Sequence, residues 1–150
     1  MRSNVNGQSM FELLVAVSIT AIILIGLMSL STISVRNTST STDTSAANRF
    51  AQEAVEFIRN ERDSTPIWAD FVTQRSDHTY CFNDTPPQSP VWNEGACNDT
   101  EIISGTNLKR DVTLTTRDPD TVDIAVTVSW DTTQGEKFVT VSSTLTNWRK

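Results

Sequence analysis

The chain has 150 residues and a formal net charge of −6, with 12 Lys and Arg against 18 Asp and Glu. This length allows one small domain with an added extended element. The acidic balance argues against a nucleic-acid binder, because affinity for phosphate backbones comes mainly from Lys and Arg. The composition is uneven, since residues 13–35 carry no charge and the rest is polar and rich in Ser, Thr, Asn and Asp. The sequence therefore predicts one membrane segment followed by a soluble head.

The start of the chain differs from an ordinary secretory signal. Such a signal has its small-residue cleavage site after the apolar stretch, whereas the small residue that stands out here is Gly7, ahead of Leu13–Val35. Cleavage after Gly7 would remove a polar leader, residues 1–7. It would retain residues 8–36 as a transmembrane and assembly helix, because the uncharged run is longer than the roughly 20 residues that cross a bilayer core.

Glu12 lies at the edge of the apolar run. An ionisable group at membrane depth is expensive and by default indicates a function. If Gln8 becomes the first residue, its new α-amino group lies one helical turn from Glu12, on the same side of the helix. The carboxylate could then pair with that amine, or with the amine of a staggered neighbouring chain. The alternative is a glutamate at the membrane interface that reaches to water.

Gly7, four further residues, Glu12 and an uninterrupted apolar helix together resemble the prepilin cleavage and methylation motif of type IV pilins and secretion pseudopilins. The resemblance covers residues 7–35. It implies that a membrane prepilin peptidase cuts between Gly7 and Gln8 and N-methylates the new terminus, and that Glu12 guides docking of the subunit into a fibre. The chain departs from the family in two places. Gln8 stands where Phe is most frequent, and Ser29 stands where many major pilins have a helix-breaking proline.

The helix has no obligatory stop for a long distance, because no proline occurs before Pro66. Residues 37–45 are mostly Ser, Thr, Asn and Asp, which are weak helix formers, and this allows a frayed or bent stretch. The helix should end near Asp63, because proline disfavours helix for the residue before it. Residues 37–63 therefore form an amphipathic continuation of the helix. Its apolar face consists of Ala47, Phe50, Ala51, Ala54 and Ile58.

Residues 64–109 are expected to form a variable loop region, because prolines and turn residues interrupt them. The chain has two cysteines, Cys81 and Cys97, and both lie in this region. An even count beyond a membrane segment predicts one disulfide made in an oxidising compartment, and two free thiols are the alternative. Even together with His78, which precedes Cys81 in the sequence, the cysteines lack the four ligands that a structural zinc site needs.

Residues 110–150 are expected to form the antiparallel β-sheet of the head. Val112–Thr116 and Val122–Trp130 alternate apolar and polar residues with the period of a strand, and Phe138–Trp148 is a third strand. Short turns join the three into a meander. Its apolar face needs cover, and the apolar face of the helix is the available partner. The fold class is therefore α+β, with a long N-terminal helix packed on a C-terminal antiparallel β-meander, an arrangement that resembles the pilin fold.

Other candidate sites are weaker. Asp118, Asp120 and Asp123 could bind calcium through carboxylate oxygens, but no twelve-residue calcium loop is present, and a solvated acidic turn is the simpler interpretation. His78 is the only histidine, and it lacks a recognisable partner for nucleophilic or metal catalysis. We therefore expect no enzyme, no cofactor and no bound metal.

Together these features predict a structural subunit, most like a minor pilin of a type IV pilus. It would begin as a single-pass precursor in the cytoplasmic (inner) membrane and end in an extracellular filament. The resemblance implies three kinds of partner: other pilin subunits, prepilin peptidase and the pilus assembly machinery in the inner membrane. No nucleic acid is expected. The alternatives are a type II secretion pseudopilin and a non-polymerising, single-pass anchored surface binding protein.

Overall fold

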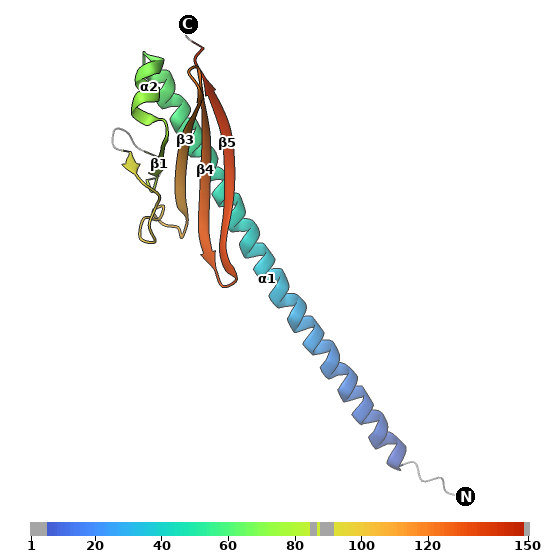
Figure 1. Cartoon of the computed structure of the whole chain (residues 1–150). Helices are drawn as coiled ribbons and strands as arrows, with labels where there is room; N and C mark the ends of the chain where they lie inside the picture. Colours follow the sequence, from blue (N-terminus) through green and yellow to red (C-terminus); the bar gives the residue numbers. More distant parts are fainter. Residues whose placement is uncertain (1–5, 85–86, 88–91, 149–150) are drawn as a thin grey trace, which may run out of the picture. The chain divides into compact units, whose positions relative to one another are not determined.

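The computed structural model describes residues 6–84, 87 and 92–148. The chain divides into two compact units, Met1–Thr42 and Asp43–Lys150, and one helix, α1 (Asn6–Ser64), contributes to both. The second unit is an α+β head. In this head, the last turns of α1 pack on one face of an antiparallel sheet (Figure 1).

The helix α1 runs without interruption through the hydroxyl-rich residues 37–45, so the frayed stretch that the sequence allows is not formed. Ser and Thr weaken helices because their side chains compete with the backbone for hydrogen bonds. Here Thr38 Oγ1 donates to the Ser34 carbonyl and Thr42 Oγ1 to the Thr38 carbonyl, each at 3.0 Å. The hydroxyls therefore bond within the helix instead of drawing the backbone out of it. The helix ends at Ser64, shortly before Pro66.

The sheet has five antiparallel strands in the order β2-β1-β3-β4-β5. Its three long strands form the predicted meander, and in β4 buried and half-buried residues alternate over most of the strand. In the tight turn between β4 and β5, Gly135 has a φ of 111°, which glycine adopts without steric cost. The strands are β1 (His78–Cys81), β2 (Asn93–Glu94), β3 (Lys109–Asp118), β4 (Thr121–Thr132) and β5 (Gly135–Thr146).

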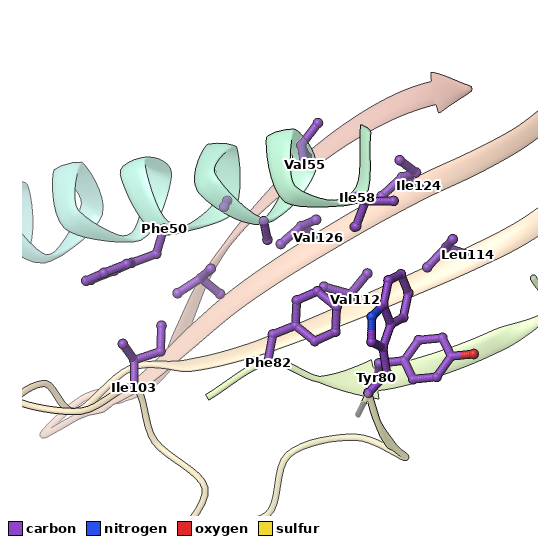
Figure 2. Close-up of a cluster of buried hydrophobic side chains, with 14 of the residues drawn as sticks. Phe50, Val55, Ile58, Tyr80, Phe82, Ile103, Val112, Leu114, Ile124 and Val126 are labelled. Carbon is purple, nitrogen blue, oxygen red and sulfur yellow. The ribbon is translucent and has the colours of Figure 1, made fainter. Parts of the chain in front are cut away.

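The core lies between α1 and the sheet. Ala47, Ala51 and Ala54 are completely buried, and their small side chains allow α1 to approach the strands closely. Phe50 and Ile58 fill the space on the same helix face, so the predicted apolar face is confirmed. Burial of each large apolar side chain contributes roughly 1.5–3 kcal/mol. Figure 2 shows this face of α1 opposite four residues of β3 and β4: Val112, Leu114, Ile124 and Val126.

The region predicted as a variable loop contains more regular structure than expected. A short helix, α2 (Trp68–Arg75), buries Phe71 against the core. Strand β1 then pairs with β3, and β2 pairs with β1. These elements have eight, four and two residues, so each is too short to produce a countable periodicity in the sequence.

Candidate functional site

Every large apolar side chain between residues 10 and 35 of α1 is exposed, from 41% at Val15 to 71% at Met10 and Met28. The largest apolar patch on a typical soluble monomer covers only a few hundred Å². The helix is long and apolar enough to cross a membrane, with a mean hydropathy of 2.7 in its most apolar window. Among the described residues, nothing covers this apolar surface.

Four of the six hydroxyl side chains of the apolar segment form hydrogen bonds within the helix. In hydrocarbon a polar group without a hydrogen bond costs several kcal/mol, and hydroxyls that bond back to the helix remove that cost. Ser29 is one of these residues. It stands where the resemblance would place a proline, and the helix continues through this position. The bonds are Ser18 Oγ to Leu14 O at 2.8 Å, Thr20 Oγ1 to Ala16 O at 2.8 Å, Ser29 Oγ to Ile25 O at 3.0 Å and Thr32 Oγ1 to Met28 O at 3.1 Å.

Glu12 is the only charged residue between residues 6 and 35. Its side chain is exposed, and within the described part of the chain its carboxylate makes no ion pair or hydrogen bond. Gly7 and Gln8 lie in the first turn of α1. Gln8 is four residues before Glu12 on this helix, so their backbone positions are about one turn apart. The proposed processing position and the carboxylate are therefore one helical turn apart, and the carboxylate is free to meet a group from outside the described chain.

Cys81 and Cys97 form a disulfide with an Sγ–Sγ distance of 1.95 Å and a Cα–Cα distance of 4.7 Å, so the predicted pairing is confirmed. The bond ties the last residue of β1 to the loop that follows β2. The backbone N–H of Cys97 also donates to Asp111 Oδ1 at 2.7 Å, which fixes this loop to β3. Burial raises the pKa of the Asp111 carboxyl, and the hydrogen bond from Cys97 works against that rise.

Loss of the disulfide should destabilise the head substantially. The Cys81→Ala/Cys97→Ala double variant is expected to lose about 3 kcal/mol of unfolding free energy, because the unfolded chain regains the entropy of an open loop. Urea unfolding of the full chain in detergent, followed by tryptophan fluorescence, measures the change. Wild-type protein kept in reductant should lose about the same amount. An unchanged unfolding midpoint in the double variant would contradict a stabilising role for the bond.

A second buried feature, Arg110, was not predicted from the sequence. Its side chain is completely buried, and it connects three parts of the head. Nε donates to Phe82 O at 2.9 Å, Nη1 to Phe50 O at 3.0 Å and Nη2 to Asp84 O at 2.5 Å. Nη1 also lies 3.4 Å from Glu53 Oε2. Arg110 therefore holds β3, α1 and the segment that follows β1 together.

The charge of Arg110 is compensated where it is buried. Burial lowers the pKa of the guanidinium, and the nearby Glu53 carboxylate opposes that effect. The sequence did contain a signal for this position, because Arg110 is in phase with Val112 and Leu114 on the buried face of β3. Strand periodicity alone does not say which carbonyl oxygens would receive the guanidinium.

The remaining candidate residues have partners within the head. His78 Nδ1 lies 2.9 Å from Glu94 Oε1 on the adjacent strand. Across the described residues, no three His, Cys, Asp or Glu side chains lie close enough together to hold a metal. The acidic turn also makes local contacts: Asp118 Oδ1 accepts from Asp120 N at 2.9 Å, Asp120 Oδ1 accepts from Asn147 Nδ2 at 3.0 Å, and Asp123 Oδ2 lies 2.7 Å from Arg117 Nη2.

Comparison of the chain with protein-family models, with curated proteins and with solved structures found no match. The geometry of the described residues thus leaves three features to interpret. They are an apolar helix surface without cover, a single carboxylate near the start of that helix, and a compact head closed by a disulfide.

Proposed function

We propose that the chain is a structural subunit of the type IV pilin kind, most like a minor pilin. The observation that carries this proposal is the position of Gly7, Glu12 and the exposed apolar segment on one continuous helix. A simple membrane anchor needs the apolar surface but has no use for a carboxylate at its edge, where a charge is expensive. A subunit that passes from lipid into a helical fibre can use both.

In this proposal the same helix surface serves two environments in turn. Residues 13–35 first span the inner membrane, and the head is exported to an oxidising compartment, where its disulfide forms. Prepilin peptidase then removes residues 1–7, and the assembly machinery moves the subunit into a filament. There the apolar surface contacts the helices of other subunits by close packing. The chain acts without catalysis or cofactor. A pseudopilin of type II secretion would use the same features.

The first test of the proposal is the N-terminus of the mature protein. Mass spectrometry of the subunit from filaments or membranes should show loss of Met1–Gly7 and a chain that begins at Gln8. A Gly7→Leu variant should remain unprocessed in the membrane, because a peptidase site that requires a small residue is blocked.

The matched control for Gly7→Leu is Gly26→Ala, a glycine substitution in the same helix. A Cβ at Gly26 meets no heavy atom within 4 Å, so this variant should be processed like the wild type. An intact Met1 in assembled material, or a cut near residue 30, would rule out the proposed processing.

A further inference from the structure

The edge formed by β5 lacks the usual protection of an edge strand. Natural sheets protect their edges with short strands, prolines, bulges or charged residues, because unpaired backbone groups otherwise recruit another strand. The opposite edge, β2, has only two residues and includes Glu94. By contrast, β5 has 12 residues and pairs with β4 in one unbroken register. Its residues 138–146 include no proline and no charge.

The hairpin fixes which backbone groups of β5 face outward. Thr132 pairs with Gly135 across a two-residue turn, and such a closing pair is hydrogen-bonded within the hairpin. The odd-numbered residues of β5 therefore bond to β4, and the even-numbered ones direct their N–H and C=O groups away from it. Thr146 agrees with this assignment, because its carbonyl accepts from Arg62 Nη1 at 2.8 Å. Among the described residues, the outward groups of Phe138, Thr140 and Ser142 have no such partner.

The side chains along this edge indicate what kind of strand would fit. Val139 and Val141 face the core but are only partly buried. Thr140, Ser142 and Thr144, on the other face, are exposed. An added strand with apolar residues on the core side would complete the burial of the two valines. Hydroxyl or other small polar residues on its outer side would continue the polar face.

We propose that the edge of β5 between Phe138 and Thr144 accepts an extended, uncharged strand from another protein, with alternating apolar and polar residues. Only an extended backbone presents donors and acceptors at the spacing of the outward groups, which is the basis of strand addition to a sheet. Figure 1 shows β5 at the edge of the sheet. This interaction belongs to the head and does not depend on the proposed processing or polymerisation of the chain.

A second copy of β5 is a poorer partner for electrostatic reasons. Antiparallel self-pairing centred on Thr140 leaves the Arg62 bond to Thr146 intact, but it places Lys137 of one copy opposite Ser143 of the other. Arg59 Nη2 already donates to Ser143 Oγ at 2.9 Å. Arg59 is also paired with Glu56, so at each end of the pair two cations, Lys137 and Arg59, would have to share one carboxylate, which is destabilising. The edge itself is uncharged, so an uncharged strand from a different protein avoids this repulsion.

Amide hydrogen exchange of the full chain in detergent micelles, measured by NMR, tests the proposal. The probe is the acetylated peptide Ile-Ala-Val-Thr-Val-Ser, which copies residues 124–129 of β4, with two lysines added at its C-terminus for solubility. Without peptide, the amides of Phe138, Thr140 and Ser142 should exchange fast and those of Val139 and Val141 slowly. Saturating peptide should slow exchange of the three even-numbered amides at least tenfold.

Variants of one residue separate strand addition from loose adhesion. Thr140→Pro removes an outward donor without breaking the β4 ladder, and Thr140→Lys adds a charge to the edge. Each should weaken peptide binding at least tenfold, whereas Thr140→Val, which keeps the donor, should bind like the wild type. If Thr140→Pro does not fold, Thr140→Lys provides the same test. Unchanged exchange of the even-numbered amides at saturating peptide would overturn the proposal. So would protection that rises with protein concentration alone, because the strand would then come from a second copy.

Discussion

Replacement of Arg110 by Met should lower the unfolding free energy of the head by about 3 kcal/mol, because buried groups that lose a partner cost roughly 1–3 kcal/mol each. Methionine can fill much of the volume but offers no donor. The carbonyls of Phe82 and Phe50, two buried residues, would lose the bonds that they accept from Nε and Nη1. Asp84 is exposed and the carboxylate of Glu53 is partly exposed, so both can turn to water. The cost therefore arises mainly where Arg110 joins Phe82 to α1.

Urea unfolding of the full chain in detergent measures this change, with the fluorescence of the buried Trp92 and Trp130 as the signal. The matched control is Arg117→Met, which removes an arginine whose side chain is 60% exposed and paired with Asp123. Exposed ion pairs contribute at most about 1 kcal/mol, so the control should unfold close to the wild type. Equal stability of the two variants would show that the buried bonds of Arg110 are not a major source of stability.

The contrast between Arg110 and the α1 face shows which parts of the fold were predictable. The alternation in β4 and the helical spacing from Ala47 to Ile58 extend over many residues, so the sequence indicates both the element and its buried face. The short elements α2, β1 and β2 have no such repetition, and long-range pairing decides their structure. Arg110 lies on a face that was predicted, but its acceptors come from residues far away in the sequence.

The placement of the candidate residues on one helix was predictable for a different reason. Gly7, Gln8 and Glu12 lie within two turns of one helix, so their relation follows from helix geometry alone. The partner of Glu12 could not be predicted in the same way, because among the described residues the carboxylate has none. A pairing group supplied by a second molecule cannot be found in the fold of one chain. Only a change at Glu12 itself can reveal it.

Glu12→Ala should leave membrane insertion and cleavage after Gly7 intact but reduce incorporation into filaments at least tenfold, which corresponds to about 1.4 kcal/mol. An unpaired carboxylate in hydrocarbon is costly. A terminal amine from a neighbouring helix removes that cost, and low dielectric strengthens the attraction. The apolar contacts along residues 13–35 provide cohesion, but they specify position poorly. We therefore expect the charge pair to fix the register of each subunit, and Glu12→Gln to behave like Glu12→Ala because charge is lost at nearly constant size.

Surface filaments sheared from cells that produce each variant can be probed by immunoblot, with the membrane fraction and the N-terminal mass measured in parallel. Glu56→Gln is the control, because Glu56 is an exposed glutamate of the same helix whose ion pair, among the described residues, is with Arg59 one turn on, so it should assemble normally. Wild-type amounts of the Glu12→Ala protein in filaments would contradict the pairing and favour a non-polymerising anchor. Loss of the variant from membranes as well as filaments would instead show that Glu12 acts at the membrane-insertion step. A selective loss from filaments, with normal cleavage after Gly7, is the result that a register-setting carboxylate requires.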